Sequence, residues 1–349
     1  MAAGFPTKNN WVAGDVLTAS ALDDLATTVN YTQYMTPRNA IINSAFDIWQ
    51  RGTSFSSPAS AAYTADRWQL VYDGTGATRT ISQQTFTPGT APVSGYESAY
   101  YCRYAQSVAG SAGTYNTFEQ HIEDVRSFAG QTVTVSFWAK LAAGASITVG
   151  MNQNFGSGGS TQVNAFSSSV TLTTSWARYT VTAAIPAITG KTIGTSSYLS
   201  LYFQVALNAT YTFDIWGVQV EAGSYANQFM RQGASQQAEL ALCQRYYQRF
   251  TSSATASTFG FGSANTTTNG YVIVHLPVSL RVPSTSLDFS ALQVSDGVTN
   301  TVVSAIASTI GNGTQQLCTI TVASGLTQYR PLFLQQNTLS GYIGFNAEL

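Results

Sequence analysis

The chain has 349 residues, of which 44% are hydrophobic and 9% are charged, and its formal net charge is −1. This length favours two or three domains. The near-neutral charge argues against a nucleic-acid binder, because such proteins carry a basic field. No run of about 18 apolar residues is present, so we expect no membrane-spanning helix. The first residues have no pattern of a secretion signal.

The small number of charged residues matters for the surface. Globular chains average about 25% charged residues, so this chain must cover its surface with Ser, Thr, Asn and Gln or with partner subunits. The three cysteines, Cys102, Cys243 and Cys318, are far apart, which predicts free buried thiols in a protein made in a reducing cytoplasm. Because the whole chain has two histidines, a histidine-based metal site or catalytic triad is nearly excluded.

Residues 1–38 form a distinct N-terminal segment. A weak capping pattern begins at Ser20, and Leu22, Leu25 and Val29 then fall on one face of a short predicted helix. A single short helix cannot bury its apolar face alone. We therefore expect this segment to dock on another structure.

Residues 39–232 have the pattern of a β-domain. Short alternating segments are separated by turn-rich stretches without intervening helices, which predicts a sandwich or a barrel. The expected strands are 133–140, 146–152, 169–172, 178–183, 198–205 and 211–220.

Residues 233–250 are predicted as a linking helix. Ser235 is a plausible N-cap, and an apolar stripe runs through Leu242, Tyr246 and Phe250 opposite Gln and Arg side chains. The stripe suits either a helix lying on a sheet or a short coil between subunits. We favour a domain junction at which the helix packs subunits together.

Residues 251–349 return to a β pattern. Val272, Val274 and Leu276 alternate on one face, whereas residues 252–269 are polar and suggest a loop. Further strands are expected at 286–294, 300–306, 316–323, 329–335 and 341–347. The segment is therefore predicted to be a second, smaller β-sandwich.

No catalytic motif is present in the sequence, and we predict a protein that is not an enzyme. The densest titratable cluster is Glu119, His121 and Glu123, which would share one face of a strand. Such a cluster could bind a metal or form an acid/base pair. The plainer interpretation, which we favour, is the polar face of one strand.

Two strands carry aromatic side chains on a polar face. Trp138 and Lys140 lie opposite the apolar face of one strand, and Tyr198, Tyr202 and Gln204 lie opposite the apolar face of another. Aromatic rings stack on the apolar face of a sugar while polar neighbours bind its hydroxyls, so these residues form a candidate carbohydrate site. The alternative is that a second layer, a loop or a neighbouring subunit covers the rings.

A calcium site is a separate possibility. Asp47 and Asp214 fall in the first and last strand regions of the large β-domain, and Asn43 could add an oxygen ligand. The alternative is that both aspartates serve turns or caps. No cofactor other than a structural Ca²⁺ is expected.

Several segments together resemble tail-fibre and related virion appendage proteins of tailed bacteriophages. Trp11, Leu17, Leu22 and Leu25 belong to a segment similar to their virion-attachment region. The similarity is collinear over residues 11–22, 39–52, 63–68, 129–140, 213–223 and 239–247. The segments within 39–232 resemble a jelly roll of the cellulose- and xylan-binding module type.

The resemblance implies a structural virion fibre protein that is attached through its N-terminus and binds host surface glycans without catalysis. It implies a homotrimer on a phage particle, with the C-terminal domain as a tip or trimerisation knob. The modules often hold a structural Ca²⁺; Asp47 matches their first-strand acid, but Asp214 stands alone where paired acids are usual. The alternatives are a polysaccharide-depolymerising tailspike and a capsid-decorating or neck fibre without a receptor role.

Overall fold

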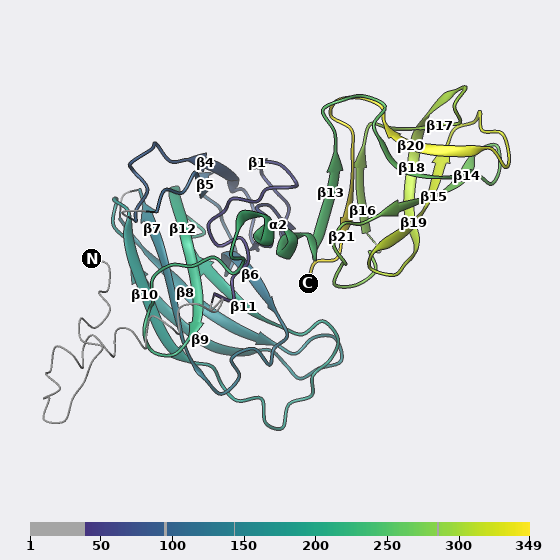
Figure 1. The fold of residues 1–349 in the computed structure, drawn as a ribbon. Helices are drawn as coiled ribbons and strands as arrows, with labels where there is room; N and C mark the ends of the chain where they lie inside the picture. The colour runs from purple at the N-terminus through teal and green to yellow at the C-terminus, as the bar shows by residue number, and fades with distance from the viewer. Residues whose placement is uncertain (1–38, 94–95, 143, 285) are drawn as a thin grey trace, which may run out of the picture.

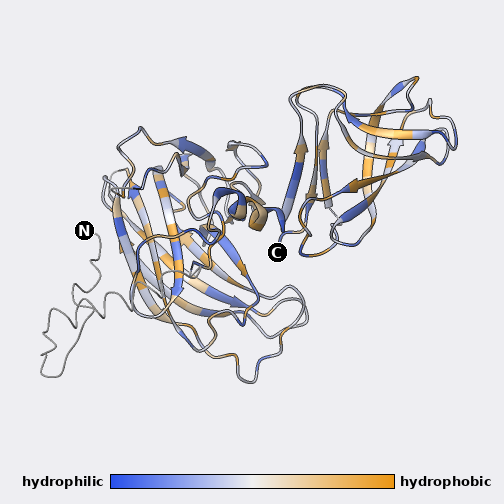
Figure 2. Cartoon of the chain, in the orientation of Figure 1, coloured by the Kyte–Doolittle hydropathy of each residue, from blue (hydrophilic) through white to orange (hydrophobic). Residues whose placement is uncertain are grey.

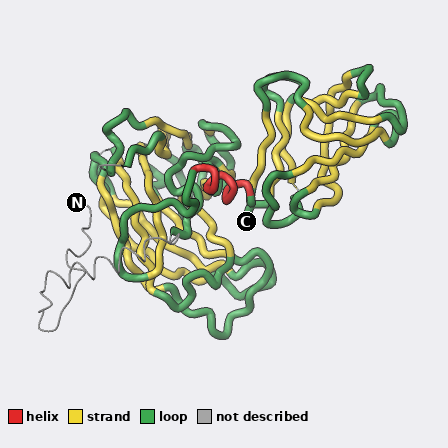
Figure 3. Tube along the Cα trace, viewed as in Figure 1, coloured by secondary structure: helices red, strands yellow, loops and turns green. Residues whose placement is uncertain are grey.

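The computed structural model describes residues 39–93, 96–142, 144–284 and 286–349. This part of the chain is almost entirely β, with a short helix between a large and a small β-domain (Figures 1 and 3). The predicted all-β class with a jelly roll is confirmed. The proposed attachment residues Trp11, Leu17, Leu22 and Leu25 lie outside the described residues. No helix among the described residues is long and apolar enough to cross a membrane.

Two six-stranded antiparallel sheets form the jelly roll. The first sheet consists, in order, of β1 (Ser54–Ser56), β4 (Thr78–Thr85), β5 (Tyr100–Val108), β12 (Tyr211–Ala222), β7 (Thr132–Leu141) and β10 (Ala177–Ala184). The second sheet consists, in order, of β2 (Ala62–Tyr63), β3 (Trp68–Tyr72), β6 (Asn116–Glu123), β11 (Tyr198–Gln204), β8 (Ser146–Asn154) and β9 (Val163–Thr171).

The core between these sheets follows from the alternation of the strands. Val135 and Phe137 of β7 meet Leu201 and Phe203 of β11 in one buried cluster, as the alternation predicts. Figure 2 shows the corresponding change between apolar and polar residues along the strands. The outer faces of the two sheets therefore carry most of the polar residues. A ligand can bind only to an outer face that no other part of the chain covers.

Helix α2 (Gln236–Gln244) is shorter than the sequence pattern suggests. Its predicted N-cap is confirmed, because the Ser235 hydroxyl accepts a hydrogen bond from the Ala238 amide at 3.2 Å. The predicted helix to residue 250 is wrong: the chain turns at Arg245 and continues as β13 (Tyr247–Thr251). Tyr and Phe pack well on a pleated sheet, and here Phe250 packs against Phe345.

The smaller domain is a closed barrel with an attached sheet, not the predicted sandwich. The attached sheet has the order β13, β21 (Tyr342–Asn346) and β16 (Ser286–Ser290). The barrel closes in the order β14 (Thr258–Ala264), β15 (Asn269–His275), β19 (Gln315–Val322), β18 (Asn300–Gly311), β17 (Leu292–Ser295) and β20 (Pro331–Gln336).

Strand β14 occupies the stretch that the sequence suggested to be a loop. Gly260 and Gly262 fall at its inward positions, so the strand lacks the apolar alternation that marks its neighbours. A Cβ at Gly262 would overlap the Tyr271 carbonyl of β15. Glycine is required here by the close approach of two backbones.

The three cysteines are free and buried, as predicted. Burial raises the pKa of Cys318 to about 12 and also raises the pKa of Cys102 and Cys243. These thiols therefore have little thiolate character and act as small apolar side chains.

Candidate functional site

Residues 224–235 cover the outer face of the first sheet over strands β12 and β7. In this segment Phe229 packs on Trp216 of β12, with 4.8 Å between the ring centroids. The same segment binds polar groups of the sheet, because the Met230 amide donates to Gln219 and the Asn227 amide donates to Glu221. Polar side chains on this outer face are consequently buried.

This cover corrects the expectation for Trp138. Its side chain is buried, with Trp216 and Phe229 rings at 5.3 and 6.1 Å and the Arg178 guanidinium 4.7 Å from its ring. Trp138 therefore offers no free ring face to a sugar. The structure agrees with the alternative interpretation, in which a loop covers the ring.

Lys140 lies on the same strand and is partly exposed. Its ammonium group is 3.5 Å from Asp214 and 5.3 Å from the centre of the Trp176 ring. Asp214 also accepts two hydrogen bonds from Arg103, at 2.7 and 2.9 Å. The structure thus places Lys140 in an ion-pair cluster on the first sheet, away from Tyr198, Tyr202 and Gln204 on the second.

The second sheet carries these three residues side by side on its outer face. In register with β11, strand β6 places Glu123 opposite Tyr198 and Glu119 opposite Tyr202. On the other side, strand β8 contributes the residues opposite β11, which are Asn154, Asn152, Gly150 and Thr148. Carboxylates, amides and hydroxyls therefore surround two tyrosine rings. We call this set the β11 face.

The rings on the β11 face are held in fixed positions. Tyr198 stacks on His121 with a centroid distance of 3.7 Å and an interplanar angle of 15°, and its hydroxyl accepts a hydrogen bond from Asn154 at 3.1 Å. Burial, and then the nearby Glu119 carboxylate, raise the pKa of Tyr198. Tyr202 lies over Gly150, where a Cβ would overlap its hydroxyl and ring, and it is buried, so this ring, like that of Trp138, offers no free face to a sugar.

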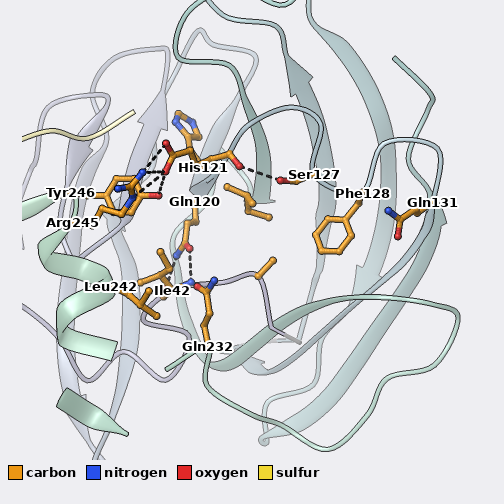
Figure 4. Close-up of a pocket in the computed structure, with 13 residues that line it drawn as sticks. Ile42, Gln120, His121, Ser127, Phe128, Gln131, Gln232, Leu242, Arg245 and Tyr246 are labelled. Atoms are coloured by element: carbon orange, nitrogen blue, oxygen red, sulfur yellow. Dashed lines mark hydrogen bonds and ion pairs between the residues drawn. The ribbon is translucent and has the colours of Figure 1, made fainter. Parts of the chain in front are cut away.

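A pocket adjoins the β11 face at His121 and Glu123 (Figure 4). Its volume is about 510 Å³, and apolar and polar side chains line it. Arg245 donates to Glu123 at 3.1 Å and the Tyr246 hydroxyl donates to the same oxygen at 2.8 Å. Burial alone would lower the pKa of Arg245, but Glu123 and Tyr246 raise it above its ordinary value. The residues after α2 thus fix one wall of the pocket.

The geometry does not favour acid/base catalysis on this face. Glu119 and Glu123 do share the outer face of β6, but four residues of strand separate their backbones by about 13 Å. Glu119 is also within 3.2 Å of His121, and Glu123 is held by Arg245 and Tyr246. The arrangement suits the binding of a neutral polyhydroxylated ligand.

The three residues considered for calcium are engaged elsewhere. Asp47 pairs with Arg231 at 2.6 Å, and Asp214 pairs with Arg103 and Lys140. The Asn43 amide closes a turn by donating to the Ile48 carbonyl at 2.8 Å. Within the described ranges, no group of three His, Cys, Asp or Glu side chains is placed to hold a metal. These residues do not fit a Ca²⁺ ion.

We expect an excess of EDTA to leave the melting temperature unchanged, because arginine cations already occupy the space beside both aspartates. A calcium site filled a hundredfold above its dissociation constant would add about 2.7 kcal/mol of stability. Differential scanning fluorimetry with EDTA and then with added CaCl₂ measures the effect. A fall in melting temperature with EDTA that CaCl₂ reverses would contradict this assignment.

The residues expected to pack an oligomer through the linking helix contact the chain itself. Leu242 and Tyr246 join a cluster with Ile42 and Ile48 of the jelly roll. Tyr246 also lies under the Arg67 guanidinium at 3.5 Å. Phe250 belongs to β13 and packs inside the smaller domain. The apolar stripe therefore serves the junction between the two domains of one chain.

Residues 89–206 match the model of a carbohydrate binding domain family. Among solved structures, a carbohydrate-binding module of family 4 matches with 19% identity and a TM-score of 0.33, over 52% of this chain and 98% of the module. A family 11 carbohydrate-binding module from Clostridium thermocellum, in complex with a β-1,3-1,4-mixed-linked tetrasaccharide, matches with 15% identity and a TM-score of 0.31, over 50% and 98%.

The enzymatically active domain of tailspike protein 4 from bacteriophage CBA120 matches with 16% identity and a TM-score of 0.34, over 54% of this chain and 22% of the tailspike chain. No curated protein matches the chain. The large domain is thus a jelly roll like that of a carbohydrate-binding module.

Sequence reasoning missed several members of this site. Asn152 and Asn154 of β8 complete the β11 face, and Arg245 and Gln232 line the pocket. The alternation of β8 marks which of its residues point outward, but no local pattern pairs β8 with β11 across 44 residues of chain. That pairing depends on the topology of the jelly roll.

Proposed function

We propose that the protein binds carbohydrate without catalysis, through the β11 face and the pocket beside it. The single observation that carries this proposal is that residues 89–206, which match the carbohydrate binding domain model, contain β6, β8 and β11 in full. The matched segment ends two residues after β11. The family similarity and the polar, aromatic face therefore fall on the same part of the chain.

The chemistry of the face supports a neutral glycan as ligand. The partly buried ring of Tyr198, stacked on His121 on one face, offers its other face to a sugar ring, and Asn152, Asn154 and Glu119 near it can bind hydroxyls. The adjoining pocket is large enough for a further sugar unit, with Gln120, Gln131 and Gln232 among its polar residues. A chain of sugars lying along β11 would reach both.

We expect Tyr198→Ala to weaken glycan binding about tenfold, because stacking of this size contributes about 1–1.5 kcal/mol. An array of purified bacterial surface polysaccharides and β-glucans identifies the probe, and isothermal titration calorimetry measures its affinity. Tyr225→Ala is the matched control, because Tyr225 is 81% exposed and lies outside the β11 face.

Equal affinity of Tyr198→Ala and the unaltered protein for the glycan would contradict the assignment of the site. Absence of binding to every glycan on the array would count against the function itself. Reducing ends released from the bound polysaccharide would overturn the non-catalytic reading in favour of a depolymerising tailspike.

We further infer that the protein is a virion fibre of a tailed bacteriophage, made in the host cytoplasm and attached through residues 1–38. The collinear sequence resemblance supports this role, and a glycan-binding domain beyond an attachment segment suits adhesion to a host surface. Several copies on one particle would raise a weak affinity through avidity. Labelling the protein on imaged particles tests the role and separates a tail position from a neck or capsid position.

A further inference from the structure

The cover formed by residues 224–235 does not extend over the whole outer face of the first sheet. Under it, outward side chains such as Trp138, Trp216 and Gln219 are buried. Further along the sheet the outward side chains are partly exposed, at Ser82 of β4, Arg103 and Ala105 of β5, Thr212 of β12 and Lys140 of β7. A second open surface therefore lies on the opposite sheet from the β11 face.

Three charged side chains lie side by side on this surface. Strand pairing places Arg103 of β5 and Lys140 of β7 on either side of Asp214 of β12. Arg103 donates to both oxygens of Asp214, to Oδ1 at 2.7 Å and to Oδ2 at 2.9 Å, and the Lys140 ammonium is 3.5 Å from Oδ2. We call Arg103, Asp214 and Lys140 the charged row. Its two cations and one carboxylate give it a net charge of +1.

The positive charge of the row faces solvent. The Asp214 side chain is 2% exposed, whereas those of Arg103 and Lys140 are 33% and 30% exposed. Both cations approach the same carboxylate oxygen, so they lie close to one another. Among the described residues, the Arg103 Nη1 group and the Lys140 ammonium have no hydrogen-bond partner. These donors are available to an anion, and the bidentate pair with Asp214 fixes the plane of the arginine.

Two aromatic rings border the charged row. The Lys140 ammonium is 5.3 Å from the centre of the Trp176 ring, and the Arg103 guanidinium is 5.9 Å from that of Tyr101. The two rings meet edge to face at 5.3 Å, and both residues are partly exposed. Arg103 also donates to the Tyr101 hydroxyl at 3.3 Å. A ligand on this surface therefore contacts aromatic carbon as well as positive charge.

We propose that the charged row and its two rings bind an acidic sugar unit, one that carries a carboxylate. The ligand carboxylate accepts hydrogen bonds from Arg103 and Lys140, and the sugar ring packs on Trp176. An inorganic anion would use the cations but gain nothing from the rings. This ligand differs from the neutral glycan proposed for the β11 face, and the two sites lie on different sheets.

The position of the row favours a saccharide over a peptide or a membrane. Strands β5, β12 and β7 each pair with a neighbour on both sides, which leaves no strand edge to which an extended peptide could add. Membrane surfaces are recognised by clusters of about four to eight lysines and arginines, whereas the charged row has two cations. Side-chain contacts from a few polar and aromatic groups are what a sugar requires.

The probes are oligosaccharides of galacturonate, glucuronate and mannuronate, each paired with its methyl ester as the uncharged form of the same sugar. We expect isothermal titration calorimetry with the full chain to show binding of at least one uronate and at least tenfold weaker binding of its ester. Lys140→Gln should weaken the binding of that uronate about tenfold, because one of the two cations is lost. This variant keeps the Arg103–Asp214 pair, and circular dichroism checks that it is folded.

Lys191→Gln is the matched control. It removes the charge of an exposed lysine that lies beside Phe155, after strand β8 of the second sheet. It should bind the uronate as the unaltered protein does. Trp176→Ala tests the aromatic contact and should weaken uronate binding about fivefold.

Failure of all three uronates to bind would overturn the proposal, and so would equal affinity for a uronate and its ester. Equal losses in Lys140→Gln and Lys191→Gln would show a general attraction by charge and would contradict the site. Unchanged affinity in Trp176→Ala, or tighter binding of poly-glutamate than of any uronate, would contradict a sugar as the ligand. These outcomes concern the uronates alone, whereas Tyr198→Ala with a neutral glycan tests the β11 face, so the two assignments can fail separately.

Discussion

Replacing Glu348 with glutamine is expected to destabilise the chain by about 3–5 kcal/mol and to loosen the junction between its two domains. Glu348 pairs with Arg67, and the two side chains are 4% and 0% exposed. Burial alone would lower the pKa of Arg67, but the Glu348 carboxylate raises it above its ordinary value, so the arginine stays charged. The substitution leaves that buried cation without its counter-charge.

The position of Glu348 explains why the effect should concentrate at the junction. Arg67 belongs to the jelly roll, where it also donates to the His121 carbonyl at 2.7 Å. Glu348 follows β21 of the smaller domain, and the Glu348 and Ala347 carbonyls both accept from Arg281 at 3.0 Å. Thermal unfolding measures the loss of stability, and an increased radius of gyration in small-angle X-ray scattering would show the domains separating.

Arg126→Gln provides the control for this experiment. It removes a 2.7 Å ion pair with Asp124, in which both side chains are exposed, at 61% and 43%. Exposed pairs contribute about 0–1 kcal/mol, so this variant should unfold almost like the original protein. Equal stability of the Glu348 and Arg126 variants would show that the junction does not depend on the buried pair.

The sequence was most informative where structure depends on alternation along one strand. It predicted that Trp138 and Lys140 lie opposite the apolar face of their strand, and that Glu119, His121 and Glu123 share a face. It did not reveal β14, because Gly260 and Gly262 take the inward positions and remove the apolar signal. Periodicity identifies the residues that share a face, but contacts between distant segments decide whether that face meets solvent.

Trp138 shows why the exposure of a strand face could not be predicted from periodicity alone. The polar residues along its strand suggested an exposed ring, but residues 224–235 cover this face, where the Asn227 and Met230 amides donate to Glu221 and Gln219 of the neighbouring strand β12. Gly217 makes the packing of the ring possible: it has a positive φ of 64° at a bulge of β12, and a Cβ there would be 2.8 Å from the Trp138 ring. A tightly packed ring of this size should contribute to stability.

We therefore expect Trp138→Ala to destabilise the jelly roll by about 3–5 kcal/mol, the usual cost of truncating a buried aromatic side chain. The loss removes ring contacts with Trp216 and Phe229 and leaves the Arg178 guanidinium without its aromatic partner. Chemical denaturation measures the change, with Trp138→Phe as the control that keeps a ring and should lose less.

Glycan affinity per folded molecule should not change in either Trp138 variant, because Trp138 lies on the first sheet and the β11 face on the second. Affinity is measured well below the unfolding midpoint, so that loss of folded protein does not imitate loss of binding. If Trp138→Ala bound glycan severalfold more weakly while its stability stayed unchanged, the ring would have to be accessible to sugar, and the cover formed by residues 224–235 would have to open in solution.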